Sequence, residues 1–372
     1  MQRIKFIDRM STGKLSRREM LKSATAFGVG LTVLPRLSAA AEVLTCLEWA
    51  GYDAPDYFGS FVNKHGGPPN FSIFAGEEDA LAKVRAGFAA DVMHPCNYSV
   101  NRFVSAGLTT PIDTAKLSNW KDIFPALQTA DGVVSGSDVV MAPADWGNSS
   151  IAYRPDLIGD AFKDGETWAI FYDEKYKDKV ALLDDPLVIQ IGAMVNGMPY
   201  DQAYKLAGAD LEAAKAMAAK AVQINRMLWT DATEIQQGLA SGEIIAAYSW
   251  NDTIKNLMGQ GIPVAYAKPK EGYFTWFCGL TLLNSGKADP ALAYDFIDAW
   301  LSPETGKALI EGSGYGHANM KSFEVAQADS VVAMGIKDPV EHMKSAILFK
   351  TMPNEVVNEQ NKAWEELKAL KQ

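Results

Sequence analysis

The chain has 372 residues, of which 35 are Lys or Arg and 45 are Asp or Glu, so its formal net charge at pH 7 is −10. Such an acidic balance argues against nucleic acid or anionic lipid as a partner, because both are recognised by basic patches. With three cysteines, no CxxC motif and four scattered histidines, we expect no disulfide-dense scaffold, no metal site and no cofactor.

The first 41 residues have the three-part layout of a secretory signal peptide. Arg17 and Arg18 precede an apolar run over 24–34, and 38–41 supplies the small residues of an A-x-A cleavage site. Paired arginines at this position are typical of a twin-arginine signal. The alternative is a membrane anchor, which needs about 20 apolar residues. We therefore expect cleavage near Ala41 and export to the periplasm.

Removal of this leader makes the chain more acidic. Residues 1–41 contain eight of the basic residues and two of the acidic ones, so 42–372 carries a net charge of −16. The remaining chain also exceeds the ~250–300 residues at which single cores stop growing. Two domains are the expectation.

Short apolar runs alternate with longer segments of helical spacing along the rest of the chain. The predicted strands are 43–49, 91–96, 139–142, 150–154, 179–183, 244–250, 264–268 and 276–283. The predicted helices are 77–88, 210–228, 231–241, 251–260 and 354–370, and Asp289-Pro290 marks another helix start. Apolar strands between helices predict an α/β fold around a largely parallel sheet.

No catalytic constellation emerges from the sequence. Asp184 and Asp185 are adjacent, so on a strand they face opposite ways and do not act on one atom. A thiol-dependent enzyme could use Cys96 or Cys278, and His94 is the one base close in sequence, two residues before Cys96. No oxyanion motif accompanies them. We expect a protein that is not an enzyme.

Aromatic residues gather at the ends of the predicted strands. A lone Trp or Tyr usually belongs to a core. In open α/β sheets, however, ligands bind outside the carboxyl ends of strands. Several aromatics at such ends favour a binding cleft. They are Trp49, Tyr52, Tyr98, Trp146, Trp250 and Trp276.

Motifs carrying these aromatics resemble those of the periplasmic spermidine/putrescine-binding proteins, which are receptors for ATP-driven importers. The resemblance runs in order through about 42–330. Its pieces are Trp49-Ala50-Gly51-Tyr52, 91–98, 143–147, 182–185, Ser249-Trp250-Asn251, 269–273, Trp276 and 295–304.

This resemblance implies the periplasmic-binding-protein fold, in which two α/β lobes close on a ligand about a hinge. Lobe one would comprise 42–148 and 275–323, and lobe two 149–274 and 324–372. The implied partner is an inner-membrane ABC permease, and the implied state is a monomer. The alternative is a sensor subunit that presents its ligand to a receptor.

Position by position, the resemblance implies an aromatic box of Trp49, Tyr52, Tyr98, Trp250 and Trp276. Such a box suits an ammonium group, since a desolvated cation–π contact contributes ~2 kcal/mol or more. The implied ligand is a small amine-bearing molecule.

The carboxylates that would anchor a polyamine are only partly retained. Asp185 is present, whereas Val188 and Cys278 stand where the family has acidic residues, and Cys96 stands where it has a serine. A buried ammonium without its counter-ion is costly, so a true polyamine site is not implied. Cys96 and Cys278 would border the ligand, as two small buried thiols, which we favour, or as a disulfide.

Two further charged residues suggest a different ligand. Asp252 follows Trp250-Asn251, and Arg226 lies near the end of the predicted helix 210–228. Arginine holds a carboxylate by two parallel hydrogen bonds. If Arg226 faces the cleft with Asp185 or Asp252, the ligand is a zwitterion such as a γ-aminobutyrate-like amino acid. The alternative is a solvated arginine at a helix C-terminus.

Overall fold

The computed structural model describes residues 43–74, 76–334, 338–345 and 347–371. The predicted signal peptide and its cleavage site lie outside them. Among the described residues, no helix combines the length and the apolar character needed to cross a membrane.

The first part of the fold is a parallel sheet. Strand β1 (Thr45–Trp49) lies between β2 (Asn70–Phe74) and β3 (Val92–Met93) and is parallel to both. The crossover helices are α3 (Gly59–His65) and α4 (Glu77–Arg85). Helix α4 has three acidic residues in its first turn and two basic ones in its last, which complements the helix dipole.

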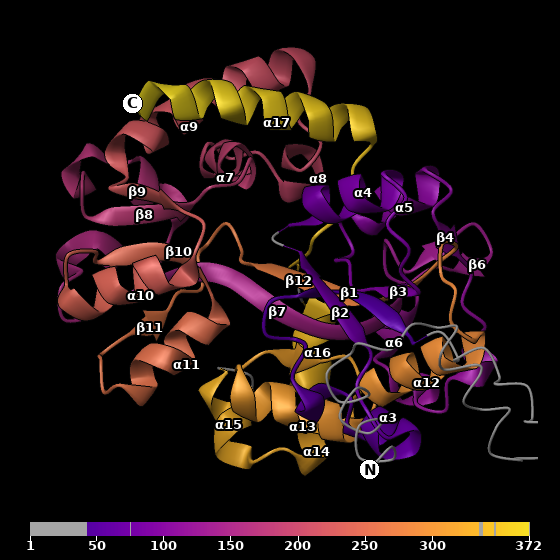
Figure 1. The fold of residues 1–372 in the computed structure, drawn as a ribbon. Helices are drawn as coiled ribbons and strands as arrows, with labels where there is room; N and C mark the ends of the chain where they lie inside the picture. The colour runs from indigo at the N-terminus through magenta and orange to yellow at the C-terminus, as the bar shows by residue number, and fades with distance from the viewer. Residues whose placement is uncertain (1–42, 75, 335–337, 346, 372) are drawn as a thin grey trace, which may run out of the picture. The chain divides into compact units, whose positions relative to one another are not determined.

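Two long antiparallel strands lie at the centre of the sheet, β7 (Ala142–Tyr153) and β12 (Phe274–Leu283). The strand order is β2-β1-β3-β12-β7-β10-β8-β9. Both strands pass from one hydrophobic core to another. Trp146 of β7 packs in the first core and Ile151 in the second. Figure 1 shows the pair running between the helices of the two cores.

The second core surrounds three further parallel strands. They are β8 (Val180–Leu183), β9 (Met227–Trp229) and β10 (Ala246–Trp250), of which β10 joins β7 in antiparallel pairing. The surrounding helices are α7 (Leu187–Val195), α8 (Tyr200–Ala203), α9 (Gly208–Ile224), α10 (Ala232–Ser241) and α11 (Asn251–Gly259).

The C-terminal part of the chain belongs to both cores. Met334 and Met343 pack in the first core, and β14 (Ile347–Leu348) then pairs in parallel with β12. Helix α17 (Asn354–Lys368) follows and buries Trp364 in the second core, beside α9. The sequence analysis expects 324–372 in lobe two, whereas Met334 and Met343 pack in the first core.

The remaining elements cover the first core or edge the sheets. They are α5 (Val100–Ser105), α6 (Pro125–Gln128), α12 (Pro290–Trp300), α13 (Pro303–Gly312), α14 (Ser322–Val325), α15 (Ala328–Ala333), α16 (Pro339–Ser345), β4 (Thr109–Thr110), β5 (Val134–Ser135), β6 (Asp138–Val139), β11 (Ala265–Tyr266) and β13 (Gly316–His317).

The α/β class is confirmed, with two corrections to the predicted elements. The sheet is antiparallel at its centre, because β7 and β12 run in opposite directions. The predicted helix 210–228 ends at Ile224, since the Asn225 side chain donates to the carbonyl oxygens of Ala221 and Phe171. Residues Met227–Trp229 form β9 instead of a last helical turn.

Cys96 and Cys278 form a disulfide. Cys278 lies on β12, and Cys96 follows β3, the antiparallel neighbour of β12. The structure therefore has the disulfide rather than the two free thiols favoured from the sequence. Cys46 is buried as a free cysteine.

Candidate ligand-binding site

Several of the predicted site residues come from the carboxyl ends of two sets of parallel strands, whereas Trp276 and Cys278 lie within β12. In the first set, Trp49 ends β1, and Tyr52 follows in a turn closed by its amide bond to the Trp49 carbonyl, 3.1 Å. In the second set, Trp250 ends β10 and Asp185 lies just beyond β8. Ligands of α/β sheets bind at this edge.

Tyr315 brings several of these residues together, although the sequence analysis did not select it. Its ring packs edge-on against Trp276, with centroids 5.1 Å apart. Its hydroxyl interacts with the Asp252 carboxyl group. Burial and Asp145 raise the pKa of Tyr52, and Tyr315 lies close enough to Tyr52 to raise it further. The loop that holds it is fixed by a hydrogen bond from the Asn251 side chain to the Gly314 carbonyl.

Two buried polar atoms in this cluster have no hydrogen-bond partner, Asp252 Oδ1 and Trp276 Nε1. Burial raises the pKa of Asp252 to about 6, and bonds from the Thr253 amide and the Tyr315 hydroxyl offset this only partly. The indole of Trp276 lies against Gly147 of β7, where any side chain would collide with it. The cluster therefore offers an unpaired acceptor and an unpaired donor.

A second group surrounds Asp185 and Tyr98. Burial raises the pKa of Asp185 to about 6, although its Oδ1 accepts a hydrogen bond from the Leu187 amide at 2.8 Å. Burial raises the pKa of Tyr98, and Glu77 and Asp185 raise it further; its ring packs against Phe349 with centroids 5.7 Å apart. As with Asp252, no lysine or arginine contributes to the pKa shift of Asp185.

Glu77 links this group to the disulfide. Its Oε1 accepts a hydrogen bond from the Cys96 amide at 2.6 Å. Burial raises the pKa of Glu77 to about 7, against the lowering effect of Ser99 and Cys96. A third buried carboxyl group thus lies next to Cys96.

His94 is a buried bridge that orients the aromatic residues. Its Nδ1 lies 2.8 Å from Glu48 Oε1 and its Nε2 lies 2.9 Å from Asp145 Oδ1. Burial lowers the pKa of His94, but the two carboxylates outweigh it and raise the pKa to about 10, so the ring is a cation at neutral pH. Tyr52 donates to Asp145 Oδ2 at 2.7 Å, and Trp49 Nε1 donates to the His94 carbonyl at 2.8 Å.

This geometry leaves His94 without a free nitrogen to activate Cys96, which is itself in the disulfide. Within the described residues, no group of His, Cys, Asp and Glu side chains could hold a metal ion.

The structure does not bring Arg226 to this edge. It precedes β9, and its amide bonds to the carbonyl of Val180, the first residue of β8. Asp185 follows the other end of β8, roughly 15 Å away at ~3.3 Å per residue. The Arg226 guanidinium pairs with Glu243 at the surface, where both side chains are exposed.

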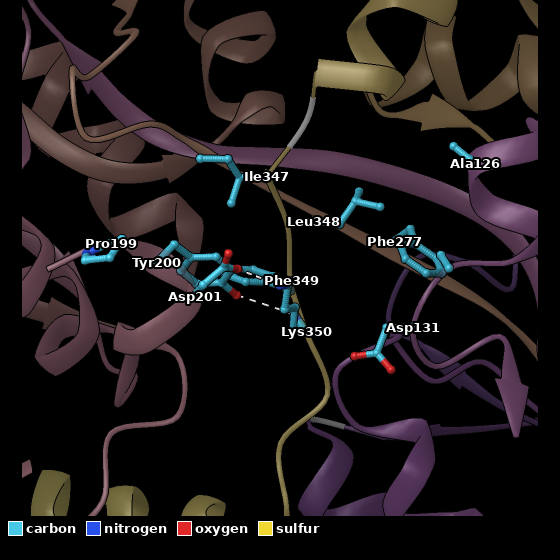
Figure 2. A pocket seen from close by; sticks show the side chains of 11 residues that line it. Ala126, Asp131, Pro199, Tyr200, Asp201, Phe277, Ile347, Leu348, Phe349 and Lys350 are labelled. Atoms are coloured by element: carbon cyan, nitrogen blue, oxygen red, sulfur yellow. Dashed lines mark hydrogen bonds and ion pairs between the residues drawn. The ribbon is translucent and has the colours of Figure 1, made fainter.

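A separate groove of about 520 Å³ lies beside β14 and includes none of the predicted site residues. Figure 2 shows Lys350 paired there with Asp201. Asp131 accepts two hydrogen bonds from Thr351, both 2.7 Å. Because its acidic groups already have partners, the groove offers a ligand fewer unpaired polar groups than the cluster around Tyr315 does.

Comparison with known proteins supplies the family. A family model described as bacterial extracellular solute-binding protein matches residues 70–335. The putrescine-binding periplasmic protein SpuD of Pseudomonas aeruginosa is 23% identical over 351 residues, which cover 90% of this chain and 94% of SpuD.

Solved structures agree on the fold. The spermidine/putrescine ABC transporter substrate-binding protein PotD of Streptococcus pneumoniae superposes with a TM-score of 0.73 at 19% identity, over 88% of this chain and 99% of PotD. MotA of A. tumefaciens B6, solved in complex with glucopine, has a TM-score of 0.69 at 18% identity, over 89% of this chain and 99% of MotA.

Proposed function

The chain belongs to the bacterial extracellular solute-binding proteins, and on that premise we propose that it delivers a small amine-bearing solute to an ABC importer. It is a solute-binding protein and not an enzyme. We propose that the two cores belong to the two lobes of this fold. The first lobe would comprise the described residues of 43–148 and 275–345, and the second those of 149–274 and 347–371.

The observation that carries the proposal is a pair of largely buried carboxyl groups to whose pKa shifts no lysine or arginine contributes. Asp185 and Asp252 both have a pKa of about 6 because they are buried, and no lysine or arginine offsets that burial. A buried carboxylate is stabilised when a cation enters beside it. The ammonium group of a ligand is such a cation, and the rings of Tyr52, Tyr98 and Trp250 favour it further.

The relatives are compatible with two classes of amine. SpuD is named for putrescine, a diamine, and MotA was solved with glucopine. A zwitterion held by Arg226 is disfavoured here, because Arg226 lies roughly 15 Å from Asp185 along β8 and pairs with Glu243. The amine is therefore held by Asp252 and Asp185, and Arg226 is left outside the proposed site.

Export belongs to the same proposal. Several relatives are named periplasmic proteins, and the leader at 1–41 has a twin-arginine signal pattern. The working form is then a periplasmic monomer that meets an inner-membrane permease. Edman sequencing of the exported protein tests the expected cleavage near Ala41.

The first test removes the aromatic ring at the end of β10. Trp250→Ala is expected to abolish ligand binding in a protein that still folds, because Trp250 is partly exposed and packs on Trp229 at 5.1 Å. A thermal-shift screen of 42–372 with putrescine, spermidine, γ-aminobutyrate, betaines and opines identifies the ligand. At ~100-fold the dissociation constant, ligand adds about 2.7 kcal/mol and moves the midpoint by several degrees.

A matched control is Trp120→Ala, since Trp120 is also partly exposed but packs against the first core away from the cluster. It should bind as wild type does. Retained affinity in folded Trp250→Ala would remove Trp250 from the site. Silence of the wild-type protein across the whole panel would refute the amine receptor.

A further inference from the structure

Tyr315, Trp276 and Asp252 form a cluster, here called the Tyr315 cluster, with two unpaired hydrogen-bonding atoms. A plain diamine cannot pair both of them. Asp252 Oδ1 is a buried acceptor without a donor, and Trp276 Nε1 is a buried donor without an acceptor. Leaving such a group unpaired destabilises the protein, so a ligand that pairs it gains affinity. An ammonium group satisfies Asp252. It has no lone pair to offer Trp276.

The two atoms belong to one cluster because their residues contact the same ring. Trp276 packs edge-on against Tyr315, and the Tyr315 hydroxyl interacts with the Asp252 carboxyl group. The six-membered ring of Trp276 fills the space that a side chain at Gly147 would need, so the indole is packed against β7. The donor is thus held within the cluster that contains the proposed ammonium site.

We propose that the ligand is an amine that also carries a hydrogen-bond acceptor, and that Trp276 Nε1 donates to that acceptor. This rests on the proposed function, because it takes Asp252 as the partner of the ligand's ammonium group. Trp276 then determines specificity: it selects amino alcohols or amino amides over diamines of equal length. The acceptor is an uncharged oxygen, a hydroxyl or an amide carbonyl.

The basic groups around the cluster already have partners, so an uncharged acceptor on the ligand is favoured over a carboxylate. Lys255, on the same helix as Asp252, donates to the carbonyl of Glu311. His94 is held between Glu48 and Asp145. Arg226 pairs with Glu243. A ligand carboxylate would therefore be buried beside an indole N–H without a cation, whereas a hydroxyl or amide oxygen needs none.

The test compares ligands that differ only at one end. Titration calorimetry with putrescine, 4-aminobutan-1-ol and γ-aminobutyrate, and with their three- to six-carbon homologues, gives the affinity for ammonium, hydroxyl and carboxylate ends. We expect the hydroxyl-bearing member to bind about five- to tenfold more tightly than the diamine of its length, and more tightly than the carboxylate-bearing member. Trp276→Phe keeps the aromatic ring and should remove the preference for the hydroxyl end over the ammonium end.

Trp168→Phe is the matched control, because Trp168 Nε1 donates to the Gly272 carbonyl in the second core. It should lower stability without changing the ratio of affinities. In ¹⁵N-labelled wild-type protein, the indole signal that Trp276→Phe removes should shift with the acceptor-bearing ligand and not with putrescine.

Tightest binding of a diamine, or a preference that survives Trp276→Phe, would overturn the inference while leaving the amine receptor intact. If no member of any series binds, the proposed function fails and the inference fails with it.

Discussion

Asp185 and Asp252, two residues of the proposed site, make ionisation unfavourable for the folded protein at neutral pH. Each has a pKa of about 6 in the folded protein, against ~3.9 in an unfolded chain. A raised carboxyl pKa favours the folded state below the unfolded value, and this stabilisation is lost as the pH rises through about 6. Relative to acid pH, ionisation of each group costs roughly 3 kcal/mol at pH 7. A ligand ammonium offsets part of that cost.

The pH dependence of binding follows from the same two groups. Because the ammonium pairs with the ionised carboxyl group, affinity should fall as the pH drops below about 6, and by about tenfold per unit once a group is protonated. Asp252→Asn should abolish most of the binding at pH 7 and yet stabilise the ligand-free protein. Calorimetric titration from pH 5 to 8 with matched denaturant melts measures both. Affinity that is flat over this range would contradict the assignment.

Single residues were predicted well where position along a strand determines their place. Trp49, Trp250 and Asp185 lie at strand ends, which a period-two pattern locates. Tyr315 was missed because it follows a short loop, 312–314, whose place depends on the distant Asn251. The indication in the sequence was the glycine-rich stretch 312–314, which predicts a turn but not the residues that the turn contacts. Arg226 was misplaced by the helix end predicted at 228.

Strands β3 and β12 are joined near the site by the Cys96–Cys278 disulfide. It spans 182 residues of sequence, so it removes a large loop entropy from the unfolded chain. Reduction, or Cys96→Ser with Cys278→Ser, should lower the free energy of unfolding by about 2–5 kcal/mol. The measurement is urea denaturation with and without reductant.

The double variant serves as the control for reduction, since reductant should not affect it further. Cys46 remains as the buried free thiol in both cases. Equal midpoints for oxidised and reduced wild-type protein would contradict a stabilising disulfide.

Buried polar residues within a strand are hard to predict from the sequence, as β7 illustrates. Strand β7 was divided into two because Asp145, Asn148 and Ser149 interrupt its apolar pattern, yet all three are buried. Asp145 is paired with His94, and Asn148 accepts from Thr275 at 2.8 Å. These partners are distant in sequence, so no local pattern could reveal that the segment is one continuous strand.

Across the whole molecule, β7 and β12 are shared by both cores. Phe274 packs in the second core and Phe277 in the first, and the two strands remain paired between them. If one core unfolded alone, it would remove the pairing that the other core needs. We therefore expect one cooperative thermal transition for both lobes, in which the calorimetric and van't Hoff enthalpies agree.

Two matched core variants test this coupling. Leu309 on α13 and Leu182 on β8 are both fully buried, Leu309 in the first core and Leu182 in the second. Either Leu→Ala substitution should destabilise by about 2–5 kcal/mol, and in a coupled molecule each lowers the midpoint of the same single transition. Two transitions, of which each variant lowers only one, would show that the lobes unfold independently. The coupled molecule also responds to ligand as one unit. Saturating ligand should raise the melting temperature of both lobes together, because neither lobe can unfold while the other keeps the site.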